Sequence, residues 1–385
     1  MSAPKGNQTF LRKYNRRLLV SLLRTEGPLS RSDLARRTGL SPSVLTRRVQ
    51  HLIQEGVVRE EGKGTSSGGR RPTLLSFNPD YAGTIGIKIE RSRLLAARVD
   101  LGGRIVARDT VELEDPADAA STVAQIEETT ERLRVGRILG VGVSVSGYVD
   151  AKQRIDFYSP ILGWRDIPLG ALLERTLHLP VHVENDVNAL SLAERIYGAG
   201  RRFAHFVCLT VGEGIGAGIV LDGTLYRGAF GAAGEIGHTT LDPDGPTCRC
   251  GERGCLEVYA SDRFLDAEAK RLGHDGISAL MDAARNAKRD AQEVFARMGH
   301  TLGLGAKNLV NLLNPEAIIL GGERMDASDL FLPTFEETVR RQSFPQAAAR
   351  LEILPGELGP DGFLIGTAAL VAEDTFGAPT TGGLA

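Results

Sequence analysis

The chain has 385 residues, 42% of them hydrophobic, and a formal net charge of −2 at pH 7. No apolar run approaches the roughly 20 residues of a membrane-spanning helix, and no apolar stretch follows the first charged residues as in a secretion signal. We therefore expect a cytoplasmic protein that has no membrane partner. The net charge conceals an asymmetry, because residues 1–80 hold 15 Lys and Arg against 6 Asp and Glu. A basic head on an acidic remainder indicates a polyanionic partner for the head, with a solvated basic face as the alternative.

The first segments of the chain predict a small DNA-binding domain. Residues 1–11 are polar and are expected to be disordered, whereas residues 12–78 begin with three short helical patterns. Ser30 caps the second helix, and Asp33 takes the N3 position of a capping box. A glycine-containing turn between the second and third helices makes a helix-turn-helix. Two short strand patterns around a Gly- and Ser-rich loop follow in residues 57–78, so we expect a winged helix-turn-helix that is mostly α-helical.

The third helix is expected to lie in the major groove of duplex DNA, where its N-terminal side chains reach base edges. Arg47 can bind guanine through two hydrogen bonds, and Arg48 on the flank suits a phosphate. The segment GGRRP fits a narrow, A·T-rich minor groove, or it is a plain flexible linker. One such domain makes few contacts, so we expect a homodimer or a dimer of dimers on a pseudopalindromic operator. The candidate DNA-binding residues are Arg31, Ser32, Ser41, Ser43, Thr46, Arg47, Arg48, Gln50, Gly69, Arg70, Arg71 and Pro72.

The sequence changes character after the head. Residues 79–373 combine short apolar strand patterns and glycine turns with helical patterns, and hairpin-opened α/β units occur twice. This arrangement predicts an α/β domain of two similar lobes with a cleft between them. Residues 374–385 carry no core signal and are expected to be disordered.

A cysteine-rich segment predicts a metal site. Three of the four cysteines, Cys248, Cys250 and Cys255, are crowded into the segment CRCGERGC, and in a cytoplasmic protein this favours a metal over disulfides. Three thiolates require a fourth ligand, and His238 lies upstream in the segment GEIGH. Such a Cys₃His set matches one structural Zn²⁺ per chain and leaves no position open for catalysis by the metal. Free surface thiols are the alternative.

Three segments together resemble the ROK family of sugar kinases and repressors: VENDVNALSLAE, TVGEGIGAGIVLDGTLYRGAFGAAGEIGH and CRCGERGCLEVYAS. With the helix-turn-helix ahead of them the chain looks like a ROK transcriptional regulator, and the likeness extends from about residue 12 to residue 373. The resemblance implies an actin-like, hexokinase-type fold of two lobes, with a sugar in the cleft and a zinc ion beside it. Carried over motif by motif, it implies sugar contacts by Gly147, Asn185, Asp186, Glu235, His238 and Glu257.

The residues allow a second interpretation at Asp186, and they depart from the family pattern at Ile161. Asp186 would be the catalytic base of a kinase, although an Asn-Asp pair at the end of a strand is also a common helix cap. Ile161 stands where the family often has an asparagine, which puts the usual glucose-like preference in doubt. We therefore expect a sugar or sugar derivative without naming it.

The phosphate-binding positions depart further from a kinase. In kinase relatives the hairpin of residues 85–95 carries an acid, a glycine and a threonine that hold Mg²⁺ and the phosphates, whereas this chain has Lys88, Glu90 and Ser92 there. Glu213 also replaces a threonine of the second phosphate loop. We therefore expect a sequence-specific DNA-binding regulator, acting as a repressor, that senses a sugar and has lost phosphoryl transfer. The alternatives are an active sugar kinase carrying a DNA-binding domain and, more weakly, a protein-interaction module.

Overall fold

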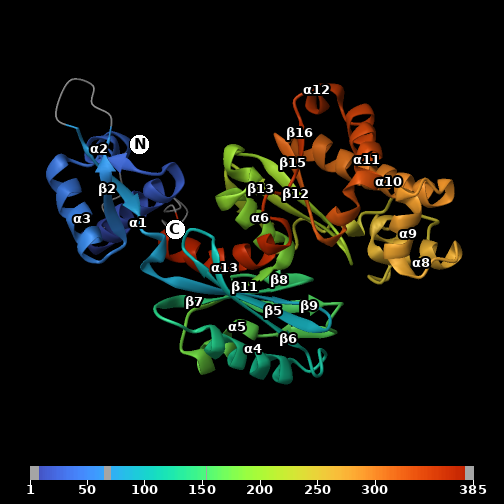
Figure 1. The fold of residues 1–385 in the computed structure, drawn as a ribbon, viewed down its shortest axis with the longest axis horizontal. Helices are drawn as coiled ribbons and strands as arrows, with labels where there is room; N and C mark the ends of the chain where they lie inside the picture. The colour runs from blue at the N-terminus through green and yellow to red at the C-terminus, as the bar shows by residue number, and fades with distance from the viewer. Residues whose placement is uncertain (1–7, 65–70, 153, 378–385) are drawn as a thin grey trace.

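The computed structural model describes residues 8–64, 71–152 and 154–377, which form a small head, a two-lobed body and a helix that reaches from one to the other (Figure 1). The strands of the head pair in the order β1-β3-β2, and its three helices with this small sheet confirm the predicted winged helix-turn-helix. The elements of the head are α1 (Gln8–Glu26), β1 (Leu29–Ser30), α2 (Arg31–Thr38), α3 (Pro42–Gln54), β2 (Val58–Lys63) and β3 (Thr73–Phe77).

Local sequence signals set the ends of α2 as predicted. The Ser30 hydroxyl accepts a hydrogen bond from the Asp33 backbone N–H at 3.1 Å, and the Asp33 carboxylate accepts one from the Ser30 backbone at 3.3 Å. These two bonds complete the capping box, which satisfies backbone donors that have no partner inside the helix. Gly39 ends α2 in the left-handed conformation, at φ 68°, where a side chain would be strained.

The N-terminal helix begins earlier than predicted. Helix α1 already includes residues 8–11, which belong to the segment expected to be disordered. The ring of Phe10 lies 6.2 Å from the ring of Tyr14 one turn later, and such pairs support a helix at its surface. Residues 1–7 lie outside the described part of the chain.

The C-terminal helix also continues further than predicted. Helix α13 (Gly362–Phe376) includes residues 374–376 of the segment expected to be disordered. The reason is tertiary, because Phe376 is 1% exposed and belongs to the apolar core of the head. Residues 378–385 lie outside the described part of the chain.

The first lobe is built on a five-stranded sheet in the order β11-β7-β4-β5-β6. Helices α4 and α5 pack on one face of this sheet, and α13 packs on the other. A separate three-stranded sheet in the order β10-β9-β8 completes the lobe. The elements are β4 (Gly83–Ile89), β5 (Arg93–Asp100), β6 (Ile105–Glu112), α4 (Ala119–Leu133), β7 (Ile138–Val145), β8 (Tyr148–Asp150), β9 (Ile155–Ser159), β10 (Trp164–Ile167), α5 (Leu169–Leu177) and β11 (Val181–Asn185).

The second lobe repeats the plan with a five-stranded sheet in the order β14-β13-β12-β15-β16. Helix α6 packs on one face and α10 with α11 on the other, so the predicted two-lobed α/β body is confirmed. The elements are α6 (Asp186–Tyr197), β12 (Phe206–Val211), β13 (Ile215–Leu221), β14 (Thr224–Tyr226), α7 (Glu257–Ala260), α8 (Asp262–Arg271), α9 (Gly276–Arg285), α10 (Arg289–Leu313), β15 (Ala317–Gly321), α11 (Ser328–Gln342), α12 (Pro345–Ala348) and β16 (Glu352–Pro355). Within the described ranges, every helix is too short or too polar to cross a bilayer.

Helices α6 and α13 join the two lobes (Figure 1). They approach so closely that a Cβ on Gly366 of α13 would lie only 1.8 Å from the Ala189 carbonyl oxygen of α6. On its other side α13 lies equally close to β7, where a Cβ on Gly142 would lie 1.9 Å from the carbonyl oxygen of Thr367. Glycine is therefore required at both positions, and α13 is wedged between the first sheet and α6.

Candidate sugar site, metal centre and DNA interface

A cavity of about 400 Å³ lies in the cleft between the two lobes. Its walls come from the turn after β4, the start of α6, the β12–β13 turn and the segment before α8. All six residues that the family resemblance assigned to a sugar line this one cavity, although they come from distant parts of the chain. They are Gly147, Asn185, Asp186, Glu235, His238 and Glu257.

The start of α6 is organised by Asn185, which is the N-cap of the helix. Its side-chain oxygen accepts hydrogen bonds from the backbone N–H groups of Val187 and Asn188 at 2.9 and 3.1 Å. Its amide nitrogen donates to the Gly147 carbonyl oxygen at 3.0 Å. The helix-cap alternative therefore holds for Asn185, and the same bonds position Gly147 and Asp186 on the cavity wall.

Asp186 occupies the first position of α6 and presents a carboxylate to the cavity. Burial raises the pKa of this carboxyl group, and the nearby Lys88 ammonium opposes the shift. One of its oxygens accepts the backbone N–H of Val187 at 3.0 Å. An ionised carboxylate has about four lone-pair sites, so Asp186 can also accept hydrogen bonds from the hydroxyls of a sugar.

Two further carboxylates and a histidine line the cavity from the second lobe. Glu257 begins α7, where its carboxylate accepts the backbone N–H of Ile215 at 3.4 Å and lies 3.6 Å from the Nε atom of Arg249. Glu235 precedes a short turn of 3₁₀ helix that ends at His238, and both residues line the cavity. The cavity thus offers several strong acceptors, which suits a ligand rich in hydroxyl groups.

The four predicted metal ligands come together in the structure. The ligand atoms of His238, Cys248, Cys250 and Cys255 all lie within 4.8 Å of one another. The Sγ atoms of Cys250 and Cys255 are 3.7 Å apart, and the Sγ of Cys248 lies 3.6 Å from Nδ1 of His238. A tetrahedron with Zn–S bonds of about 2.3 Å has S–S edges of about 3.8 Å, so the residues fit a structural zinc ion.

At the end of the cavity where the family resemblance places the phosphates (the phosphate end), a lysine takes the place of the expected acid. The Lys88 side chain is 7% exposed, and its Nζ atom lies 3.1 Å from the carboxylate of Glu323 and 3.4 Å from that of Glu90. The ammonium also lies 3.8 Å from the centre of the Phe363 ring. Because Lys88 belongs to the first lobe and Glu323 to the second, this ion pair crosses the cleft.

A second ion pair crosses the cleft at its rim. The Nε atom of Arg91, in the turn after β4, donates to the carboxylate of Glu213 in the β12–β13 turn at 2.9 Å. Arg249 approaches the same residue, donating to the Glu213 carbonyl oxygen at 3.4 Å. The sequence motifs pointed to Glu213 and Lys88 but not to Arg91 and Arg249 as partners of Glu213, or to Glu323 as the partner of Lys88, because the positions of these partners carry no motif of their own.

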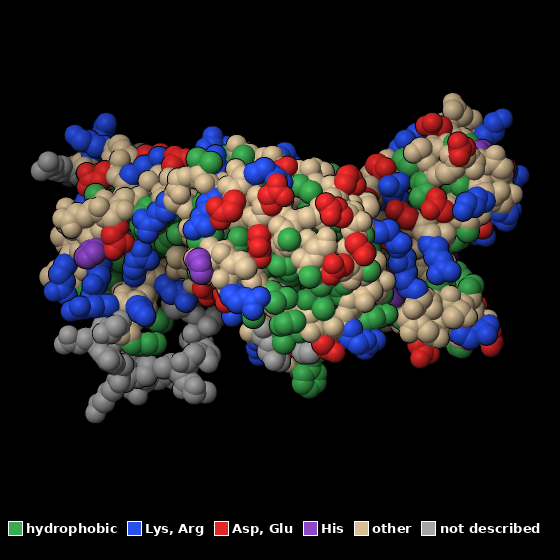
Figure 2. All heavy atoms as spheres, turned by 90° about the horizontal axis from the view of Figure 1, so that it is seen from below, with side chains coloured by type: hydrophobic (Ala, Val, Ile, Leu, Met, Phe, Trp, Pro, Cys, Tyr) green, Lys and Arg blue, Asp and Glu red, His purple; other side chains and the backbone are tan. Residues whose placement is uncertain are grey.

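The first half of α3 is open to solvent, as a recognition helix must be. Figure 2 shows Lys and Arg side chains gathered on the head, whereas they alternate with acidic side chains over the body. Ser41 and most of the predicted base-reading residues are exposed. A shallow groove along the helix is lined by Pro42, Ser43, Thr46, Arg47, Gln50, His51 and Gln54.

The two predicted DNA-binding residues on α2 already have partners within the head. The guanidinium of Arg31 donates to the carboxylate of Glu60 on β2 at 3.0 Å, and the Ser32 hydroxyl lies 2.8 Å from that of Ser30. The Arg31–Glu60 ion pair is at the surface, whereas Ser30 is buried, so a phosphate contact by Arg31 would replace one with a carboxylate. Such an exposed ion pair is worth little, about 0–1 kcal/mol.

Arg48 is half-buried on the flank of α3. Desolvation lowers the pKa of its guanidinium, and the positive charges of Arg47 and Arg12 lower it further. Three clustered arginines that repel one another favour an anion between them, which suits the predicted phosphate contact.

The basic linker is described only in part. Arg71 is exposed, and the Pro72 carbonyl oxygen accepts the backbone N–H of Gly64 at 2.8 Å. Gly69 and Arg70 lie outside the described residues. The predicted minor-groove contact therefore stays a prediction.

Comparison with known proteins identifies the family. Residues 84–374 match the model of the ROK family. The chain belongs to the ROK family. Residues 11–59 of this ROK protein match the model described as winged helix-turn-helix DNA-binding.

Relatives of this ROK protein include regulators and enzymes. It is 32% identical over 377 residues to the xylose repressor of Bacillus spizizenii, covering 96% of this chain and 97% of the relative. It is 33% identical over 315 residues to the glucokinase of Streptomyces coelicolor, covering 75% and 98%. Among solved structures, a ROK family transcriptional regulator described as a homologue of the E. coli Mlc protein superposes with a TM-score of 0.84 at 27% identity, covering 96% of this chain and 98% of the other.

Proposed function

We propose that this ROK protein is a transcriptional repressor that responds to a sugar or sugar derivative and no longer transfers phosphoryl groups. The observation that carries the proposal is the buried Lys88 ammonium at the phosphate end of the cleft, in an ion pair with Glu323 of the opposite lobe. The alignment with a xylose repressor over nearly the whole chain, head included, supports the regulatory part.

The charged groups at the phosphate end disfavour catalysis. Phosphoryl transfer depends on Mg²⁺ that bridges the phosphates and on groups that stabilise their negative charge. Lys88 offers no carboxylate to hold Mg²⁺ where kinase relatives have an acid, and Glu213 and Glu323 bring carboxylates, already paired with Arg91 and Lys88, to the place of the phosphates. The glucokinase relative keeps an active sugar kinase as the competing function.

A structural zinc ion would be held by His238, Cys248, Cys250 and Cys255. When bound, zinc supplies a fixed tetrahedral anchor for its four ligands. That anchor would orient His238 on the cavity wall and would hold Arg249, which lies between two of the ligands, close to Glu257. We therefore assign the metal an indirect role in sugar affinity.

The head would bind an operator as a homodimer or a dimer of dimers, because one winged helix makes few specific contacts. The name of the Bacillus relative makes xylose the first effector to test. Sequence preference would come from Arg47 and its neighbours on α3, and salt-dependent affinity from the basic cluster around Arg48.

The regulatory proposal is tested by enriching duplexes from a random DNA pool on the full-length protein, and then measuring affinity for the enriched site with a panel of sugars. We expect one sequence to be enriched and one sugar to change its affinity. Arg47→Ala should flatten the sequence preference, whereas Arg289→Ala, a surface arginine remote from the head, should not. Failure to enrich any sequence would contradict the proposal.

The loss of phosphoryl transfer is tested by ATP consumption at high protein concentration with each sugar that binds. We expect no sugar-dependent consumption and no ATP binding by calorimetry. Turnover in the ordinary enzyme range of about 1–10³ s⁻¹ would establish the competing function, a kinase with a DNA-binding domain.

A further inference from the structure

Helix α13 connects the cleft to the head directly. Near its N-terminus Phe363 lines the cavity, and its ring lies under the ammonium of Lys88. At its C-terminus the Phe376 ring lies 5.7 Å from the ring of Phe77 and 6.2 Å from that of Tyr81, inside the core of the head. Fifteen residues of helix span about 22 Å. One helix therefore touches both the cavity and the head.

Helix α6 runs from the same cavity to the same end of α13. It begins with Asn185 and Asp186 at the cavity, and Arg195 lies in its last turn. The close packing of Gly366 on Ala189 leaves little room for one helix to move without the other. The two helices thus form a pair that could transmit a shift at the cavity over the length of α13.

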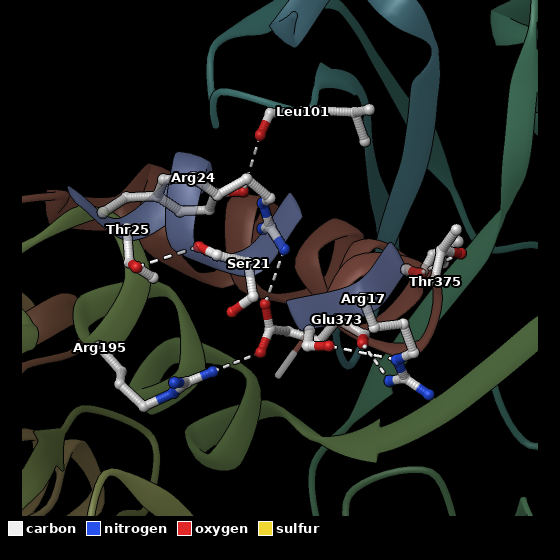
Figure 3. Close-up of polar contacts among 11 residues, drawn as sticks. Arg17, Ser21, Arg24, Thr25, Leu101, Arg195, Glu373 and Thr375 are labelled. Atoms are coloured by element: carbon white, nitrogen blue, oxygen red, sulfur yellow. Dashed lines mark hydrogen bonds and ion pairs between the residues drawn. The ribbon is translucent and has the colours of Figure 1, made fainter. Parts of the chain in front are cut away.

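The carboxylate of Glu373 contacts both α6 and the head (Figure 3). One oxygen of Glu373 on α13 accepts a hydrogen bond from Arg24 of α1 at 3.0 Å, and the other accepts one from Arg195 of α6 at 2.6 Å. The Arg24 side chain is only 7% exposed. Arg17 of α1 donates to the Glu373 carbonyl oxygen at 3.3 Å, so the head and α6 meet at this residue.

The groups around Glu373 can form a second set of hydrogen bonds. Within the described residues, the Nε atom of Arg195 is buried and has no hydrogen-bond partner. A planar guanidinium binds a carboxylate best through two parallel hydrogen bonds, so a small shift of the α6–α13 pair relative to α1 would draw Glu373 away from Arg24 and allow Arg195 to take both oxygens. Sharing of the carboxylate favours two discrete arrangements, because the Arg24 side chain is nearly buried and a buried charge without its partner is costly.

We propose that Glu373 is the positioning residue through which the sugar site controls the orientation of the head, an inference that rests on the proposed function. A ligand alters DNA affinity only if it favours one of two states. Sugar binding at the start of α6 would favour one way of sharing the Glu373 carboxylate between Arg195 and Arg24. The head, anchored on α13 by Phe376, would then adopt the orientation that belongs to that state.

The test compares full-length wild type with Glu373→Gln, which keeps the shape of the side chain and removes its charge. Operator affinity is measured with and without the effector sugar, sugar affinity by calorimetry, and thermal stability alongside. Allosteric couplings are typically about 5–150-fold. In the wild type we expect the sugar to change operator affinity by a factor in this range. In Glu373→Gln the sugar should change operator affinity by less than about twofold, and sugar affinity in the absence of DNA should stay the same.

Matched variants distinguish a loss of coupling between sugar and operator binding from a loss of folding. Asp374→Asn removes the same charge from the next position, where the side chain is 69% exposed and faces His182, and should keep the full response. If Glu373→Gln fails to fold, Arg195→Gln provides the same test by removing the α6 arm, and Arg24→Gln removes the head arm. If Glu373→Gln or Arg195→Gln folds and the sugar still changes its operator affinity as in the wild type, this inference is overturned and the proposed function stands. A wild type that binds the operator but shows no response to any sugar would overturn the sensing function and the inference together.

Discussion

The two ends of the cleft differ in how their acidic groups are satisfied. At the sugar end, Asp186 and Glu257 project into the cavity and retain acceptor capacity for a ligand. At the phosphate end, Glu323 and Glu213 are matched across the cleft by Lys88 and Arg91. The comparison teaches that short ion pairs across the cleft take up the acceptor capacity of a carboxylate, whereas Glu257 retains capacity beside a cation that is 3.6 Å away. Under the proposed function, the scaffold keeps the sugar half of a kinase-like site and fills the phosphate half with its own ion pairs.

The largest expected effect is at the sugar end. Asp186→Ala should weaken sugar binding by about 10–150-fold, because a hydrogen bond to a charged group contributes about 1.5–3 kcal/mol. Calorimetry with the effector sugar measures the change, and operator binding in the absence of sugar should stay as in the wild type. A sugar affinity within threefold of wild type, on the scale of about 0.6 kcal/mol, would place the effector elsewhere.

The next effect concerns the metal beside the sugar end. Cys250→Ser should abolish zinc binding, and sugar affinity should fall by about 10–100-fold as the support of His238 is lost. Elemental analysis of protein purified under reducing conditions provides the first measurement. Cys208→Ala is the control, because this buried thiol on β12 is not among the four clustered ligands and its loss should leave the zinc content at one per chain.

At the phosphate end the expected effect is on stability. Lys88→Met should lower the free energy of unfolding by about 1–3 kcal/mol, since it leaves the Glu323 carboxylate without its cation. The value is below that of a fully buried pair because the Glu323 side chain is 48% exposed. Urea unfolding measures it, and restoration of stability in Lys88→Met with Glu323→Gln would confirm that the pair is the cause.

The smallest effect is expected at the rim. Arg91→Met removes a cation that is 61% exposed, and a surface ion pair contributes only about 0–1 kcal/mol. Its unfolding free energy should therefore stay within about 1 kcal/mol of the wild type, and the difference should shrink in high salt. A loss as large as that of Lys88→Met would contradict the ranking of the two cross-cleft pairs.

Much of the molecule follows from local sequence. The spacing of Ser30 and Asp33 specifies a helix start because the two residues bond each other's backbone. The crowded cysteines and His238 converge because a short segment with glycines brings its thiolates close together. The family motifs also indicated which residues line the cavity. In each case the interactions that matter connect residues near in sequence, or residues whose motif carries its own chemistry.

The tertiary structure alone decides the contacts between segments that are distant in sequence. The pairing of Lys88 with Glu323 joins residues that are 235 positions apart, and the bond from Arg24 to Glu373 joins residues 349 apart. Neither glutamate stands in a motif that predicts its partner. Phe376 is similar, because its segment carries no periodic apolar pattern, yet its side chain belongs to the core of the head. Such contacts depend on how the lobes and the head pack, and packing brings together surfaces whose complementarity is not visible along the chain.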